Sequence, residues 1–360
     1  MADLMPNVST LQSSLGRRRG IARLTVEMSR AETEVSTGRK ADLFRDLGQR
    51  ATESVVLRSR MTRNDNFVTS NTLLAGQLEV TALALTEIRD VSEDFLALAV
   101  GNRESKGGTV QALRDNALAT LQQVIGQGNL RFQGVSVFAG VDSAADSLAA
   151  WSEPDPVTGL SPEDVIAAIT GAGPTSAAEA EAMADEIAAI FDGTDPDPAR
   201  RFEGVFYKGT PEMLAGGGAA PRVEARIDEG VTIRHGVQAN DQPFRDLIRG
   251  LVMIASVDPA QIEDDGAYSA YMTRAVDAVA AGTSGLLAAS GRLGGQQALV
   301  ERTITAQEDR RDIYNSRVLA LESVDPYEAG SRVKTLEAQL EASYAVASRL
   351  ANLSILNFLV

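Results

Sequence analysis

The sequence predicts a mainly α-helical protein. In it, the two chain ends form a long antiparallel helical rod, and a small mixed α/β domain is inserted in the middle. Apolar residues recur three or four positions apart over both ends of the 360-residue chain, as in helices that pack along a narrow stripe. Aromatic residues make up only 5% of the chain, which favours long helices over a large sheet. Prolines gather between Pro154 and Pro221, where the helical pattern is lost.

The N-terminal part, residues 1–140, begins with a helical stripe. Leu4, Val8, Leu11 and Leu15 lie four, three and four positions apart, which predicts an inner helix over about 4–37. The dipeptide Thr37-Gly38 ends it. A long helix without proline follows over about 42–100, and a strand entry is predicted over 129–140.

The C-terminal part, residues 237–360, mirrors this order. A long helix is predicted over about 267–322, and a terminal inner helix over about 327–360 follows the break at Val324-Asp325-Pro326. Segments of matching length at both ends predict that the rod folds back on itself. Glycines interrupt the long element, and at about 1 kcal/mol each against alanine they favour a break or bend near 282–285. These glycines are Gly282, Gly285, Gly291, Gly294 and Gly295.

The segment 141–236 is predicted to form the inserted outer α/β domain. Ser161 followed by Pro162 is typical of a helix start, and 176–191 predicts a second helix. Residues 201–207 and 222–234 are interpreted as strands, the latter with a tight turn at Glu229-Gly230.

Composition excludes several functions. The formal net charge of −15 argues against nucleic acid or an anionic membrane as a partner. Cysteine is absent, and the one histidine, His235, has no second histidine to share a metal. No nucleophile, phosphate loop or calcium loop is recognisable, so we expect no enzyme, no catalytic, cofactor-binding or metal site, and no cofactor.

Several stretches, taken in order, resemble the bacterial flagellin superfamily, most closely the hook–filament junction proteins of the hook-associated protein 3 type. They are Glu34-Val-Ser-Thr-Gly-Arg-Lys40, Asn129–Gly140, Gly230-Val-Thr-Ile with Asn240, Asp241 and Phe244, Gly291-Arg-Leu-Gly294, and Ser343-Tyr344 through Leu353-Ser-Ile-Leu-Asn-Phe-Leu359.

One stretch departs from the family pattern. Ala41-Asp-Leu-Phe-Arg-Asp-Leu-Gly48 stands where the family commonly carries a Pro-Ser-Asp-Asp-Pro-like segment. A divergent flagellin, a subunit of the filament itself, therefore stays open as an alternative. A coiled-coil secreted translocator or an export chaperone is a further alternative, although neither needs the strand-bearing centre.

The resemblance implies a structural axial component that joins hook to filament, with terminal helices that pair only on assembly. It implies self-association in a ring, contact with a hook-side protein of the hook-associated protein 1 type and with flagellin, and an export chaperone. It also implies an extracellular place in the flagellum, reached by the flagellar type III route without a cleaved signal peptide. The expected assembly residues are Leu4, Val8, Leu11, Leu15, Leu340, Tyr344, Ala347, Leu350, Leu353, Ile355, Leu356, Phe358 and Leu359.

Overall fold

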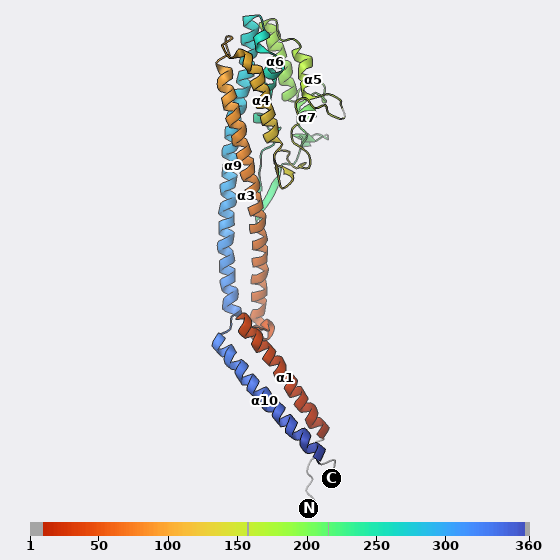
Figure 1. Cartoon of the computed structure of the whole chain (residues 1–360), viewed down its shortest axis with the longest axis vertical. Coiled ribbons are helices and arrows are strands. Elements are labelled where there is room, and N and C mark those ends of the chain that lie inside the picture. Colours follow the sequence, from red (N-terminus) through yellow and green to blue (C-terminus); the bar gives the residue numbers. More distant parts are fainter. Residues whose placement is uncertain (1–9, 157, 215, 357–360) are drawn as a thin grey trace, which may run out of the picture. The chain divides into compact units, whose positions relative to one another are not determined.

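The computed structural model describes residues 10–156, 158–214 and 216–356, and its chain divides into two compact units (Figure 1). We call residues 1–66 with 306–360 the terminal unit and residues 67–305 the central unit. Long helices come from both chain ends and short strands lie only between them in the described chain. The predicted fold class is confirmed.

The terminal unit is helical throughout its described part. Its elements are α1 (Thr10–Thr37), α2 (Leu43–Leu47), a 3-10 turn (Gly48–Arg50), the start of α3 (Ala51–Val100), the end of α9 (Asp265–Glu322) and α10 (Pro326–Leu356). The helix predicted from about residue 42 is therefore two helices. Gly48 separates them because its φ of 55° is a conformation that glycine adopts without strain.

Helix α9 passes through all five glycines without interruption, so the break predicted near 282–285 is wrong. The glycines at the first two positions make room for a neighbouring helix, α8 (Gln242–Ser256). A Cβ on Gly282 would lie 2.4 Å from the backbone nitrogen of Leu247, and one on Gly285 would lie 2.8 Å from Pro243. Close backbone packing thus offsets the poor helix propensity of glycine.

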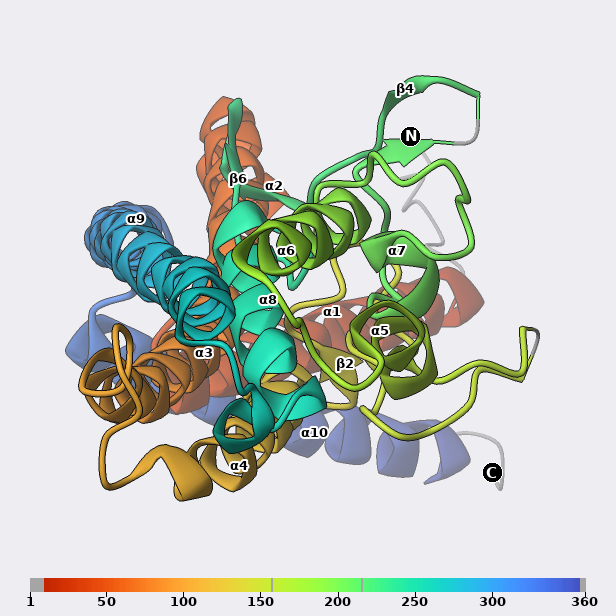
Figure 2. The ribbon, with the colours of Figure 1, turned by 90° about the horizontal axis from the view of Figure 1, so that it is seen from above.

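The central unit is built around α8 (Figure 2). Helices α4 (Val110–Gly128), α5 (Pro162–Thr170) and α6 (Ala177–Phe191) all contact it. Nine of its fifteen residues are buried, as expected for a helix that neighbouring elements cover on nearly every side. Its Phe244 ring meets the Phe138 ring edge-on at 5.5 Å. One continuous core joins these helices to parts of α3 and α9.

In the described chain, strands form three separate antiparallel hairpins. They are β1 (Arg131–Phe132) with β2 (Val135–Ser136), β3 (Met213–Leu214) with β4 (Gly218–Ala219), and β5 (Glu224–Asp228) with β6 (Val231–Arg234). Gly230, with a φ of 75°, occupies the turn where the sequence predicts one.

The strand predicted over 201–207 is wrong. Residues Phe202–Val205 form a short helix, α7, and only Tyr207 makes an isolated bridge, to Leu148. The helical turn brings Phe202 and Phe206, four residues apart, onto the same side, where both rings pack against Phe191. Aromatic packing at helical spacing therefore prevails over the strand pattern.

The central unit contains more of the chain, residues 67–305, than the segment 141–236 that the sequence predicts as a domain. Trp151 and Phe191 inside that segment share one core with Leu121 before it and Leu251 after it. A domain of 141–236 alone stays a prediction, while the observed compact unit includes the helices on both sides.

Candidate assembly interface

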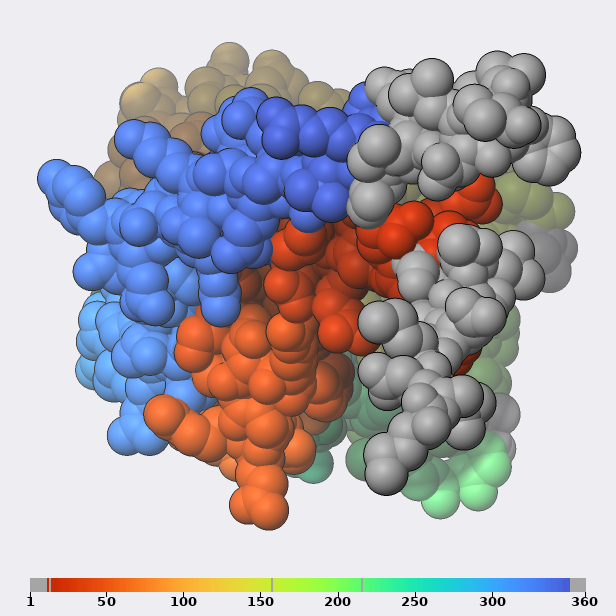
Figure 3. All heavy atoms as spheres, turned by 90° about the horizontal axis from the view of Figure 1, so that it is seen from below, coloured from red at the N-terminus to blue at the C-terminus, as the bar shows by residue number. Residues whose placement is uncertain are grey.

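Helices α1 and α10 pack side by side in the terminal unit (Figure 1), and the space-filling view shows their side chains in direct contact (Figure 3). The contact buries Ala31, Ala329 and Leu336 and half-buries Leu24 and Met28. On α1 the side that faces α10 therefore includes Leu24, Met28 and Ala31, whereas Leu15 of the predicted stripe is 45% exposed.

The structure describes only part of the predicted assembly set. Leu4, Val8, Phe358 and Leu359 lie outside the described residues. The side chains of Leu11, Leu350, Leu353, Ile355 and Leu356 also lie outside them. Of the rest, Leu340 and Ala347 are half-buried, whereas Leu15 and Tyr344 are 45% and 56% exposed. Their role in assembly remains a prediction.

The packed face of α10 follows a slightly different line from the predicted one. Its buried and half-buried positions continue from Leu336 through Leu340 and Ser343 to Ala347. Ser343 is therefore half-buried at this position, whereas the neighbouring Tyr344 is 56% exposed. Spacings of four, three and four are those of a coiled-coil seam.

Apolar side chains remain uncovered on the outer surface of the terminal unit. A buried side chain of this size is worth about 1.5–3 kcal/mol against an exposed one, so this surface favours contact with further protein. The exposed side chains are Leu15, Val26, Val35, Phe44, Val55, Val56, Ile313, Leu319, Tyr327, Tyr344 and Val346, with Tyr327 90% and Phe44 70% exposed.

The turn after α1 is joined to the turn before α10 by backbone hydrogen bonds. Gly38, with a φ of 67°, ends α1 by donating its N–H to the Glu34 carbonyl at 2.9 Å. The Lys40 N–H donates to the Glu322 carbonyl at 2.8 Å, and the Val324 N–H donates to the Gly38 carbonyl at 3.1 Å. We call this connection, over residues 38–40 and 322–324, the helix joint.

The buried carboxylate of Glu322 stabilises the helix joint through hydrogen bonds to α3. Its side chain is 1% exposed and accepts hydrogen bonds from Ser54 Oγ and from Arg58, whose Nε lies 2.7 Å away. Arg39 adds an ion pair at 3.8 Å. The hydrogen bonds from Arg58 hold the pKa of Glu322 below its usual range; burial opposes this, and the Ser54 bond adds to it.

A second buried carboxylate, Glu34, lies beside the helix joint. It is 6% exposed, accepts a hydrogen bond from the Ala41 N–H at 3.3 Å, and faces Arg332 of α10 at 3.5 Å. The two glutamates thus connect the end of α1 to the start of α10, and the end of α9 to the start of α3. Because both are paired, they act as structural anchors.

Replacing Glu322 with glutamine should destabilise the terminal unit by about 1–2 kcal/mol, because Arg58 and Arg39 lose their charged partner. Urea unfolding followed by circular dichroism measures the change. The matched control is Glu337→Gln on the exposed surface of α10, which should stay within about 0.5 kcal/mol of the wild type. Equal effects of the two substitutions would contradict the role of Glu322.

The same pair predicts a pH dependence. A carboxylate whose folded pKa is depressed stabilises the folded state above its unfolded pKa, about 4.3, and loses that contribution as pH falls through the folded value. The free-energy difference between wild type and Glu322→Gln should therefore hold from pH 7 to about pH 5 and shrink below about pH 4. A difference that grows on acidification would contradict this assignment.

The sequence contains the parts of the helix joint without revealing that they meet. Glu34–Lys40 and the break at Val324-Asp325-Pro326 are both recognisable, but their pairing and the role of Glu322 depend on tertiary contact. The only sequence signal is an acidic residue directly before a helix break. Within the described residues no group of His, Asp and Glu is arranged to hold a metal ion. No described helix is long and apolar enough to span a membrane.

Two family models match the chain, one at each end. The model of the bacterial flagellin N-terminal helical region matches residues 8–143, and that of the C-terminal helical region matches residues 276–359. Together they cover more than half of the chain. The chain belongs to the flagellin family. It is a structural component of the flagellum, and its family is structural rather than enzymatic.

The helix joint connects the two flagellin regions to each other. Residues 38–40 lie in the N-terminal region and residues 322–324 in the C-terminal region. Helix α1 likewise lies in the N-terminal region, and the helix that it contacts, α10, lies in the C-terminal region. The stretch 144–275, which neither flagellin model covers, contains α5 to α8 and the hairpins β3–β4 and β5–β6.

Among solved structures, this flagellin-family chain resembles a Vibrio parahaemolyticus protein provisionally assigned as a flagellar hook-associated protein. The two share 10% sequence identity with a TM-score of 0.51, over 76% of this chain and 98% of the other. At 10% sequence identity, this structural similarity supports the fold alone. No curated protein sequence matches the chain.

Proposed function

We propose that this chain is a hook–filament junction subunit. It joins the hook to the filament as a structural axial component, and its terminal helices pack as coiled coils against those of neighbouring subunits. Copies associate with one another in a ring. On one side they meet a hook-side protein of the hook-associated protein 1 type, and on the other side they meet flagellin.

The observation that carries this proposal is the apolar surface left uncovered on the terminal unit. Within that unit the buried apolar side chains are few. Leu57, Val318 and Leu321 form one small cluster, and Ala31 and Leu336 lie between α1 and α10. Large exposed side chains, among them Tyr327 and Phe44, surround them. Neighbouring subunits would supply the missing cover, as an axial polymer provides.

Two features favour a junction subunit over a filament subunit. The structural neighbour is provisionally assigned as hook-associated, and it shares the arrangement over most of its length. The stretch Leu353–Leu359 also resembles the tail of junction proteins.

A divergent flagellin remains the second candidate, and one observation favours it. The stretch 41–48, which contains α2, lacks the common family sequence and carries the exposed Phe44. This departure from the common family sequence fits a filament subunit that has diverged from other flagellins.

Electron microscopy of cells that lack this protein tests the proposal. Hooks without filaments are expected, and an antibody against the central unit should mark a single band between hook and filament in the parent strain. Antibody along the whole filament would identify a flagellin instead. An unchanged flagellum would overturn both.

The proposal includes export by the flagellar type III route without cleavage of a signal peptide, assisted by an export chaperone. Mass spectrometry of sheared flagella should find peptides from the first residues of α1 and from upstream of it. Finding the chain only inside flagellated cells would contradict export.

A further inference from the structure

A shallow hollow of about 580 Å³ lies on the terminal unit, between α1 and α2. It combines three arginines with apolar surface, and its valine is 53% exposed. Its lining residues are Ala22, Arg23, Val26, Glu27, Arg30 and Arg45. We call it the arginine hollow.

The arginine hollow is positively charged, and its charge is incompletely paired in a single copy. Helix α1 carries five arginines against three glutamates, in a chain whose formal net charge is −15. Arg30 and Arg45 pair with carboxylates of the same unit, at nitrogen–oxygen distances of 3.3 and 3.6 Å. Arg23 is exposed and has no ion pair among the described residues.

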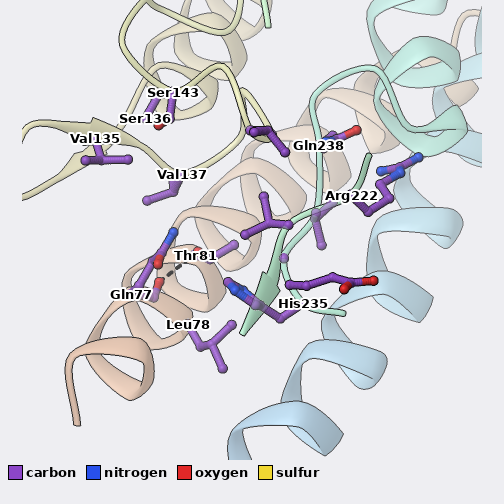
Figure 4. Close-up of a pocket in the computed structure, with 16 residues that line it drawn as sticks. Gln77, Leu78, Thr81, Val135, Ser136, Val137, Ser143, Arg222, His235 and Gln238 are labelled. Atoms are coloured by element: carbon purple, nitrogen blue, oxygen red, sulfur yellow. Dashed lines mark hydrogen bonds between the residues drawn. The ribbon is translucent and has the colours of Figure 1, made fainter. Parts of the chain in front are cut away.

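A pocket of about 340 Å³ in the central unit, between α3 and the loops around β2, β5 and β6, provides a contrast (Figure 4). Its arginine and its glutamate both pair within the same unit. Arg222 lies 2.7 Å from Asp241, and Glu224 lies 2.9 Å from Arg234. The charges of that pocket therefore have partners in a single copy, whereas Arg23 in the arginine hollow lacks one.

An acidic counterpart of the arginine hollow lies on α10. Glu337, Glu341 and Tyr344 lie three or four residues apart, so they are neighbours on the helix surface. All three are exposed, Tyr344 by 56%. Within the described part of the chain neither carboxylate has an ion pair, although Lys334 lies three residues before Glu337. Tyrosine and arginine are the side chains that most often supply binding energy at protein interfaces.

The two surfaces lie on opposite faces of the α1–α10 pair. Glu34 of α1 faces Arg332 of α10 at 3.5 Å, and this ion pair marks one face. At about 100° per residue, Arg23 and Arg30 lie within about 40° of Glu34 around α1. Arg30 and Arg332 also line a common small pocket. Glu341, in contrast, lies about 180° from Arg332 around α10, so the arginine hollow cannot reach it within one copy.

We propose that Glu337, Glu341 and Tyr344 of one copy dock into the arginine hollow of the next copy. The Tyr344 ring packs on Val26, and the two carboxylates pair with Arg23 and the arginines beside it. Because the contact joins two different surfaces on opposite faces, it repeats from copy to copy around a ring or along a helical polymer. The inference rests on the proposed function, since it names the surface through which terminal helices of neighbouring subunits meet.

The absence of cysteine makes a crosslink the direct test. A chain carrying Val26→Cys and Tyr344→Cys, expressed in place of the wild type, should give disulfide-linked dimers and higher multimers in isolated, oxidised flagella. The matched control pairs Val26→Cys with Val346→Cys. Val346 is 51% exposed but lies about 160° from Tyr344 around α10, so the control should stay monomeric on a non-reducing gel.

Charge reversal tests the same contact by rescue. Arg23→Glu and Glu341→Arg should each lower the amount of chain in flagella at least about fivefold. Each should keep the melting temperature of the soluble chain within about 2 °C, because both side chains are exposed. The two substitutions in one chain restore an attractive pair between copies and should return incorporation to within about twofold of the wild type. Glu308→Arg makes the same change of charge at an exposed position of α9 and should incorporate normally.

The inference is overturned if the cysteine pair at positions 26 and 344 stays monomeric in flagella that contain it. A chain with both charge reversals that incorporates no better than either single variant would overturn it equally. Absence of the wild-type chain from flagella would instead refute the proposed function itself.

Discussion

Removal of Leu350–Val360 is expected to leave the melting temperature of the soluble chain within about 2 °C of the intact chain and to abolish its incorporation into the flagellum. Seven large apolar side chains lie in these eleven residues. At about 1.5–3 kcal/mol each, they contribute on the order of 10 kcal/mol once neighbours cover them. In a single copy the described part of α10 packs on α1, and one neighbouring helix cannot cover both sides of another.

The deletion requires a control in which the tail keeps its apolar residues. Asn352→Ser with Asn357→Ser changes two polar positions there and should incorporate normally. Differential scanning calorimetry of the soluble chain and quantification of the chain in isolated flagella give the two readouts. A deleted chain that melts far below the intact one would place the tail in the core of a single copy.

Substitution of two glycines in the same helix should change stability in opposite directions. Gly282→Ala forces a Cβ to within 2.4 Å of the Leu247 backbone, so α8 and α9 must separate, at a cost of about 3 kcal/mol. Gly291→Ala meets nothing within 4 Å and should stabilise the chain by about 0.5–1 kcal/mol through helix propensity alone.

Urea unfolding followed by circular dichroism compares these two variants with the wild type. Both substitutions add the same methyl group to α9, so only the neighbouring helix distinguishes them. If both raise stability, the close packing of α8 on Gly282 is not present in solution.

Periodicity predicted the four helices of the two flagellin regions well. The stripes over 4–37 and 327–360 correspond to α1 and α10, and the long elements correspond to α3 and α9. These helices are long and amphipathic, so local pattern is strong evidence for them. The break near 282–285 was wrong because helix propensity is local, whereas the close approach of Leu247 to Gly282 is a tertiary contact.

One helix of the central unit has no counterpart among the predicted elements, namely α4 over Val110–Gly128. Helix α8 begins beside Asn240, Asp241 and Phe244, which are among the stretches that resemble the flagellin family, and its apolar run Leu251–Ala255 is typical of a buried core helix. That signal was present in the sequence.

The helix joint could not be found from sequence. Glu322 and Arg58 lie 264 positions apart. They form no motif, because their contact depends on how two distant helices meet. The assembly residues at the extreme ends rest on pattern and resemblance alone.

Hydrogen–deuterium exchange, compared between the soluble chain and isolated flagella, tests most directly whether neighbouring copies complete the terminal helices. Amides of α1 and α10 should exchange quickly in the soluble chain and at least about tenfold more slowly in flagella, while those of α8 stay protected in both. Equal protection of α1 and α10 in the two states would contradict the account, because the terminal pair would then be complete in a single copy.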